Sequence, residues 1–269
     1  MARAELHVRS CYSYYQGASH PHELLLRARE LGISALALAD VDSLAAALKF
    51  SLTARSLGIR PIVGAELTLV GGGSIVLLCR DARGYSNLCR LISLAHRHDR
   101  RRPAVALEAV LGEAQGLVCL LGRRSPVAAL LRSWRLEEAR ALTHRLWEAF
   151  GQHLYLEASH HLLPGDDDLV RGLLRLSQET GVPLLAVADA FYHHPRRKRL
   201  LQALAAVRHR TPLDALGERL PRGDMCLRGR EELLRRLPGL EEAFRLADRV
   251  AEECRLSLPQ DLEYRFPEP

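Results

Sequence analysis

The sequence predicts an α/β fold, and two observations lead to this prediction. Short apolar runs that are typical of buried strands, such as Ile33–Ala39 and Leu117–Leu121, alternate with amphipathic stretches typical of helices, such as Leu136–Phe150. The alternation repeats through most of the first 195 residues. So many strand–helix units in one chain favour a sheet covered by helices, arranged either as a barrel or as a doubly wound sheet.

Local signals define the expected elements in chain order. Ala4–Val8 is the first strand, and His20–Leu31 is a helix that Gly32 ends. Gly71–Gly73 is expected to turn a hairpin between two strands. The other predicted strands lie near 61–63, within 67–79, and at 153–157 and 183–188, and the other predicted helices lie at 43–57, 84–96 and 167–180.

The character of the chain changes after about residue 195. Arg196–His209 and Glu231–Arg255 are predicted helices, separated by a stretch containing proline and glycine. Leu258–Pro269 is expected to be an extended connector. The predicted organisation is therefore a barrel core at 1–195 and a helical extension with a connector at 196–269.

Composition limits the classes of protein to which the chain can belong. No apolar run approaches the roughly 20 residues needed to cross a bilayer, so no membrane association is expected. The six cysteines are scattered without a C-x-x-C pair, which favours reduced thiols in the cytoplasm. No G-x-G-x-x-G or Walker sequence follows a predicted strand, so no nucleotide cofactor is expected.

The chain is basic, with a net charge of +6 from 38 basic and 32 acidic residues. Arginine binds phosphates bidentately, so DNA is one conceivable partner. The candidate contacts are Arg100, Arg101, Arg102, Arg196, Arg197 and Lys198. The alternative interpretation is that these runs are solvated faces, because no set of stacking aromatic residues accompanies them.

Polar side chains follow several of the predicted strands at the points where the strands end. They are His7, Asp40, Glu66, His161 and Asp189. Because the carboxyl ends of barrel strands meet at one mouth, we expect these side chains to share a pocket. Imidazoles and carboxylates form a nitrogen and oxygen ligand set suited to divalent metals.

Several segments resemble the PHP (polymerase and histidinol phosphatase) domain, in particular that of bacterial DNA polymerase III alpha subunits of the error-prone branch. They include Glu5–Ser10, Gly17–Pro21, Ala35–Asp40, Gly58–Glu66 and the closing helix through Ala247–Glu252. The resemblance covers essentially the whole chain in order. It implies a distorted seven-stranded β/α barrel with a metal cluster at its mouth, and an extension that leads into a polymerase body.

The same resemblance implies that the metal cluster is incomplete. His7, Asp40, Glu66, His161 and Asp189 match ligand positions, whereas Arg9, Gln16, Val41, Arg123 and Phe191 stand where other ligands are expected. His96 and His98 lie near a further ligand region. Hydrolysis of phosphoesters at such sites needs two or three metals, which these residues cannot assemble. Two arrangements remain open: one weakly held zinc or manganese ion, or a metal-free network in which Arg9 and Arg123 act as fixed cations beside Asp40, Glu66 and Asp189.

The function predicted first is therefore a non-catalytic PHP module that serves a structural or partner-binding role in DNA replication or translesion repair. Its expected partners are DNA polymerase subunits or the polymerase body, and no cofactor is expected. The alternative is a metal-dependent phosphoesterase or 3′–5′ exonuclease that acts on DNA. No catalytic residue is assigned, and no polymerase catalytic acids are identified.

Overall fold

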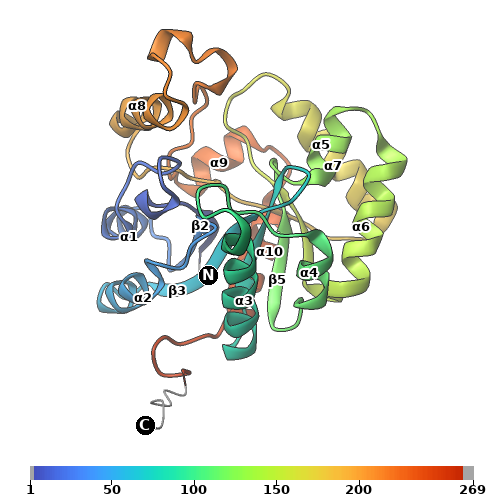
Figure 1. Ribbon diagram of the computed structural model, residues 1–269, viewed down its shortest axis with the longest axis horizontal. Helices are drawn as coiled ribbons and strands as arrows, with labels where there is room; N and C mark the ends of the chain where they lie inside the picture. Colours follow the sequence, from blue (N-terminus) through green and yellow to red (C-terminus); the bar gives the residue numbers. More distant parts are fainter. Residues whose placement is uncertain (1–2, 263–269) are drawn as a thin grey trace.

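A curled sheet of seven strands organises the chain, and helices cover its outer face (Figure 1). The computed structural model describes residues 3–262, except for the side chain at position 98. The strands are β1 (Ala4–Val8), β2 (Ala35–Val41), β3 (Arg60–Thr68), β4 (Ser74–Cys79), β5 (Leu117–Leu121), β6 (Leu154–Ala158) and β7 (Leu184–Ala186). The predicted distorted seven-stranded β/α barrel is confirmed.

Ten α-helices lie within the described residues. They are α1 (Pro21–Glu30), α2 (Ala47–Ser56), α3 (Ala82–His98), α4 (Leu107–Gly112), α5 (Pro126–Arg132), α6 (Leu136–Phe150), α7 (Asp166–Thr180), α8 (Lys198–His209), α9 (Arg230–Arg236) and α10 (Glu241–Glu253). None of these helices is long and apolar enough to span a membrane.

The strands follow one another in sequence order across the sheet, and all pairs are parallel except those that involve β4. The predicted hairpin at Gly71–Gly73 joins β3 to the antiparallel β4. The two edges of the sheet meet beyond β7, where Arg9 N–H donates to the Ala190 carbonyl at 2.9 Å and Ala190 N–H donates to the His7 carbonyl at 3.0 Å. This bridge brings the end of β1 beside the segment that follows β7.

Helix α10 packs against the inner apolar side chains of the sheet at the end where β1 and β6 begin: Ala4 N–H donates to Asp248 at 2.8 Å, and His153 lies 3.1 Å from Glu253. It contacts β1 and β7, and its buried Ala247, Val250 and Ala251 share one apolar cluster with residues of most strands. Small side chains on β2, such as Ala37 and Ala39, belong to the same cluster. The helix therefore forms part of the barrel core, although it lies in the segment predicted as an extension. The expected division at residue 195 stays a prediction.

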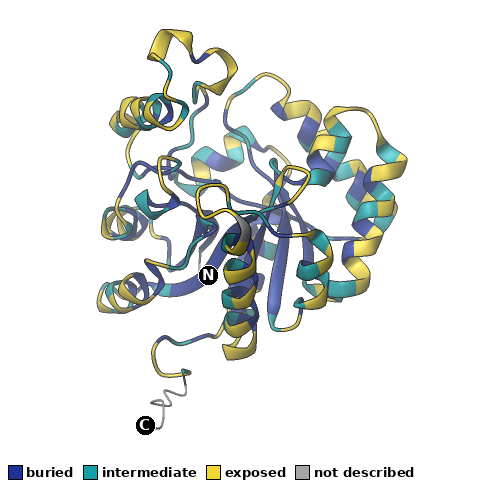
Figure 2. Cartoon of the chain, in the orientation of Figure 1, coloured by how far each residue is buried: buried dark blue, intermediate teal, exposed yellow. Residues whose placement is uncertain are grey.

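Most of the other helices bury their apolar faces on the convex side. Figure 2 shows buried strands between helices that are exposed on their outer sides. Leu88 and Leu91 of α3 and Leu146 of α6 are examples of residues buried in this outer layer. Burial on both faces explains why the strands are almost continuously apolar in sequence.

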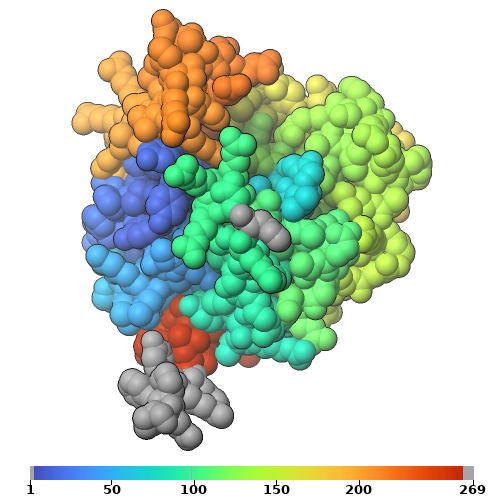
Figure 3. Space-filling view, in the orientation of Figure 1, coloured from blue at the N-terminus to red at the C-terminus, as the bar shows by residue number. Residues whose placement is uncertain are grey.

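Helix α8 and the loop after it form a lobe over the N-terminal segment (Figures 1 and 3). A small apolar cluster joins them, in which Leu201 and Cys226 pack with Ala18, Phe191 and Tyr192. The lobe thus lies next to the segment that follows β7.

One helix prediction was wrong, and two helices were not predicted. The predicted helix Glu231–Arg255 is two helices, because Pro238 cannot donate a backbone hydrogen bond and Gly239 adopts a left-handed φ of 79°. The sequence analysis also missed α4 and α5, although Ser125 followed by Pro126 is a typical helix start. The predicted connector lies mostly outside the described residues, and residues 258–261 form a turn.

Removal of α10 tests its place in the core. A chain that ends at residue 238 would expose Leu6, Leu185 and Val187, which α10 helps to bury. We expect this chain to lose its cooperative thermal transition, whereas a chain that ends at residue 262 keeps it. Circular dichroism melting curves compare the two, and a cooperative transition in the shorter chain would contradict the assignment.

Candidate functional site at the barrel mouth

Three of the five predicted site residues meet in one buried network. His7 at the end of β1 places Nε2 3.3 Å from Glu66 Oε2 of β3, and its Nδ1 lies 3.5 Å from Asp189 Oδ1 after β7. Its Nδ1 also lies 3.0 Å from Oε1 of Glu157, at the end of β6. All four side chains are at most 2% exposed. The ends of four strands therefore converge, as expected for a barrel mouth.

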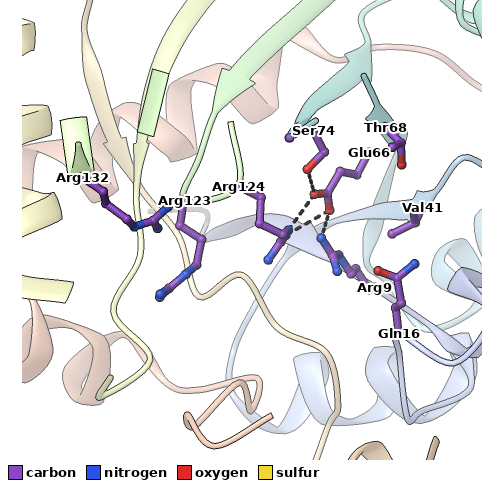
Figure 4. Close-up of a pocket in the computed structure, with 10 residues that line it drawn as sticks. Arg9, Gln16, Val41, Glu66, Thr68, Ser74, Arg123, Arg124 and Arg132 are labelled. Atoms are coloured by element: carbon purple, nitrogen blue, oxygen red, sulfur yellow. Dashed lines mark hydrogen bonds and ion pairs between the residues drawn. The ribbon is translucent and has the colours of Figure 1, made fainter. Parts of the chain in front are cut away.

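Two arginines, Arg9 and Arg124, contact the carboxylate of Glu66 (Figure 4). Arg9 donates through Nη2 to Glu66 Oε2. Arg124 donates to Glu66 through Nε at 2.7 Å and Nη2 at 3.0 Å, and to Asp189 through Nη1 at 3.1 Å and Nη2 at 3.0 Å. The predicted pairing of Arg9 with Glu66 is thus present. The predicted pairing of Arg123 with Asp40, Glu66 or Asp189 is wrong, because the next residue, Arg124, takes this place.

The loop between β5 and α5 explains which arginine turns inward. Ser125 caps α5, and Ser74 N–H donates to the Arg124 carbonyl at 2.9 Å, which fixes the loop beside β4. In this geometry Arg123 points to Asp166, with Nη1 2.9 Å from Oδ1. The two neighbouring arginines therefore pair with different carboxylates.

Phe191 supports the two cations. Its ring centroid lies 4.4 Å from Arg9 Cζ and 5.1 Å from Arg124 Cζ. A guanidinium over an aromatic face gains electrostatic attraction, which is larger where water is excluded. Phe191 thus contributes to the same network as the charged residues.

The charges in the network balance one another. Burial alone lowers the pKa of His7, but Glu157 and Asp189 raise it to about 10, so His7 is protonated near neutral pH. Burial alone raises the pKa of Glu66, but Arg124 and Arg9 hold it well below its usual range. His7, Arg9 and Arg124 are thus the cations that face the carboxylates Glu66, Glu157 and Asp189.

Asp40 has different partners from those predicted. Its carboxylate accepts hydrogen bonds from Ser10 N–H at 2.7 Å and from Ser13 Oγ at 2.6 Å, and the Ser10 hydroxyl donates to both of its oxygens. Burial raises the pKa of Asp40, although the two serines oppose the shift. Asp40 therefore organises the loop after β1, and in the described structure it forms no ion pair with Arg9 or Arg123.

His161 lies at the edge of the network with both ring nitrogens engaged. Nε2 is 3.0 Å from the Asp189 carbonyl oxygen, and Nδ1 is 3.3 Å from Arg123 Nη1. Burial lowers the pKa of His161 to about 4, so the ring is neutral near pH 7. The neutral ring donates through Nε2 and accepts through Nδ1, which positions the backbone of Asp189 at its left-handed φ of 49°.

The remaining candidate residues have simpler surroundings. Gln16 and Val41 line the mouth beside Arg9. His96 Nε2 lies 2.9 Å from the Asp42 carbonyl oxygen, and the side chain of His98 lies outside the described residues. Among the candidate DNA contacts, Arg100, Arg101, Arg102 and Arg196 are exposed, Arg197 pairs with Glu23, and Lys198 donates to the Arg222 carbonyl.

The sequence analysis missed Glu157 and Arg124 as site residues. Glu157 follows the pattern of the other sites, because it lies at the end of a predicted strand. Gly122 faces it so closely that a Cβ at this position would collide with the Glu157 carboxylate. A glycine directly after the strand Leu117–Leu121 was the feature of the sequence that could have indicated such a close approach of another side chain.

One set of described side chains has the geometry of a possible metal site. Ligand atoms of His7, Glu157 and Asp189 all lie within 4.8 Å of one another. To bind a metal through nitrogen, however, His7 must lose the proton that Glu157 and Asp189 stabilise. Arg124 must also release Asp189.

The comparisons with known proteins agree with this architecture. The PHP domain model matches residues 5–161. The chain belongs to the PHP domain family. It is 36% identical over 273 residues to an error-prone DNA polymerase of Anaeromyxobacter dehalogenans, and 35% identical over 282 residues to one of Symbiobacterium thermophilum. These alignments cover 96% and 97% of the chain but only 23% and 26% of the relatives, so the chain spans about a quarter of their length.

A solved structure of an amidohydrolase from Chromobacterium violaceum is also similar to the chain. The match covers 87% of this chain and 97% of that one, with a TM-score of 0.48 at 16% sequence identity.

Loss of Arg9 should destabilise the fold. Arg9→Ala leaves a buried carboxylate with fewer partners, and breaking one side of a buried ion pair typically costs about 3–5 kcal/mol. We expect a loss near the lower end of this range, because Arg124 still holds Glu66. Urea unfolding measures the change, and Arg27→Ala, which breaks a partly exposed pair, serves as the control with a loss below about 1 kcal/mol. A neutral Arg9→Ala variant would refute the ion-pair role.

The His7 imidazolium should make stability depend on pH on the alkaline side. Its pKa is about 10 in the folded chain and about 6.5 when unfolded. The protonated His7 therefore contributes fully to the free energy of unfolding below pH 6.5. This contribution is lost as the pH rises through 10, and the free energy falls by at most about 1.4 kcal/mol per pH unit. Urea unfolding between pH 7 and 10 should show this slope in the parent and in His144→Gln, whose side chain is exposed. His7→Gln should lack it, and equal slopes in all three proteins would exclude His7 as the cause.

Proposed function

We propose that this chain is a non-catalytic PHP module of the DNA polymerase type. In this proposal a metal-free ion network replaces the metal cluster, and the module acts as a structural or partner-binding part of a polymerase used in replication or translesion repair. The observation that carries the proposal is the position of Arg9 and Arg124, whose guanidinium groups bind the carboxylates of Glu66 and Asp189.

Guanidinium groups at these positions oppose metal binding in two ways. They occupy the carboxylate oxygens that a cation needs as ligands, and their positive charges repel a divalent ion. Arginine remains protonated in proteins, so a change of pH does not remove this obstacle. The protonated His7 adds a third positive charge beside the same carboxylates.

The polymerase connection rests on the relatives. They are named error-prone DNA polymerases, and this chain matches about a quarter of their length. We infer that the module associates with a polymerase body, and DNA is a further proposed partner through the exposed arginines at 100–102.

A metal-dependent phosphoesterase or exonuclease is the second candidate. The cluster of His7, Glu157 and Asp189 favours it, since its three ligand atoms lie close enough to hold one ion. One zinc or manganese ion could bind there only after His7 loses its proton and Arg124 moves. Metal content therefore separates the two functions.

The expected result is that chain purified without a His-tag or chelator contains far less than one equivalent of zinc or manganese by elemental analysis. Changing Arg9, Val41 and Phe191 to histidine supplies imidazoles, but Arg124 still blocks Glu66 and Asp189. We therefore expect metal binding in the variant that also carries Arg124→Gln. The three-histidine variant with Arg124 intact is the matched control and should stay nearly metal-free.

Two equivalents of metal in the parent chain would overturn the proposal and support the function as a phosphoesterase or exonuclease. A three-histidine variant that loads metal as well as the fourfold variant would show that Arg124 is no obstacle. Thermal unfolding of each variant separates a failure to bind from a failure to fold.

A further inference from the structure

An open pocket lies at the mouth beside the ion network (Figure 4). It has a volume of about 360 Å³. Its lining consists of Arg9, Gln16, Val41, Glu66, Thr68, Gly73, Ser74, Arg123, Arg124 and Arg132. Four of these side chains are guanidinium groups and one is a carboxylate. The lining therefore holds more positive than negative side chains, although Arg9, Arg123 and Arg124 each form an ion pair.

Arg132 accounts for part of this excess charge. It lies at the end of α5, and its side chain has no hydrogen bond or ion pair with any residue that the structure describes. Burial lowers the pKa of Arg132, and repulsion by Arg123 and Arg124 lowers it further, while attraction to Asp166 opposes part of the shift. A positive charge under such repulsion favours the binding of an anion.

Arg9 offers a second unused donor. Its Nε is buried and, within the described part of the chain, lacks a hydrogen-bond partner. A buried donor without a partner is costly, so a ligand that accepts from it gains affinity. Gln16, Thr68 and Ser74 add polar side chains to the same lining.

A groove of about 500 Å³ continues from this pocket. Arg123 and Arg132 line both spaces. The apolar lining of the groove comes from Leu131, Trp134, Leu136, Pro164 and Leu169. Trp134 is 86% exposed and holds a left-handed φ of 58°, a conformation that is strained for a bulky residue. Strained exposed residues are common at ligand-binding sites.

We propose that this double pocket binds a phosphate monoester, with the phosphate among the arginines and an aromatic substituent in the groove beside Trp134. Guanidinium groups bind phosphate oxygens bidentately, and the pocket has room for a tetrahedral dianion together with part of its substituent. Nucleobases stack on exposed tryptophan rings, which fits the groove. The ligand is bound and not cleaved, so no metal is required. The inference rests on the proposed function, because the arginines make the mouth a site for anions.

Titration calorimetry on metal-free protein tests the inference with three probes: inorganic phosphate, dTMP and thymidine. Phosphate should bind, dTMP should bind more tightly, and thymidine should bind weakly or not at all. The fluorescence of Trp134 should change when dTMP binds, since Trp134 lines the groove. Succinate tests whether the pocket selects phosphate over a carboxylate.

Matched variants locate the binding site. Arg132→Gln should weaken phosphate and dTMP about tenfold or more, because a charge-assisted hydrogen bond is lost. Its fold should be intact, since Arg132 has no partner in the described structure. Arg245→Gln removes the same charge from the exposed face of α10 and should change neither affinity. Trp134→Leu should weaken dTMP about fivefold or more and leave phosphate unchanged.

The outcomes distinguish this inference from the proposed function. Metal-free protein that binds neither phosphate nor dTMP overturns this inference alone, as does equal weakening by Arg132→Gln and Arg245→Gln. Succinate binding as tight as phosphate binding overturns the phosphate assignment. Phosphate binding that requires added zinc or manganese overturns both proposals, because the anion would then be held by the metal.

Discussion

The arrangement of the barrel mouth depends on the carboxylate of Glu66. It accepts hydrogen bonds from Arg9 directly after β1, Arg124 of the loop before α5 and Ser74 at the start of β4, and it lies against the His7 ring. One buried anion thus holds together segments that are far apart in sequence. Without this anion the two guanidinium groups and the imidazolium would repel one another across the same space.

Balance of charge makes such a network tolerable inside a protein. Isolated ions cost several kcal/mol to remove from water, and opposite charges with good geometry offset that cost. Asp189 completes the balance, since it binds Arg124 and lies close to the His7 and His161 rings. The network lies at the mouth, while α10 packs against the inner apolar side chains at the opposite end of the barrel. Polar and apolar interactions therefore stabilise different parts of one closed sheet.

The sequence allowed the strands and the convergence of their ends to be predicted, because apolar runs and parallel topology require both. It could not show which of two consecutive arginines turns inward, since that depends on the start of α5 at Ser125 and on a hydrogen bond from Ser74. Nor could it show that Asp40 pairs with serines. The break between α9 and α10, in contrast, could have been predicted, because Pro238 and Gly239 in the sequence indicate the end of a helix.

Stability alone does not explain why charge persists at this mouth. A buried ion network often stabilises a fold no more than apolar side chains of similar size would, and Phe191 and Val41 show that apolar residues already fit here. Arg132 lines the pocket beside the network and has no hydrogen bond or ion pair with the residues that the structure describes. Fixed and partly unpaired positive charges are what a site for an anion requires. In the two proposals made above, the arginines that oppose a metal ion also supply the positive charge that an anion needs at the open mouth.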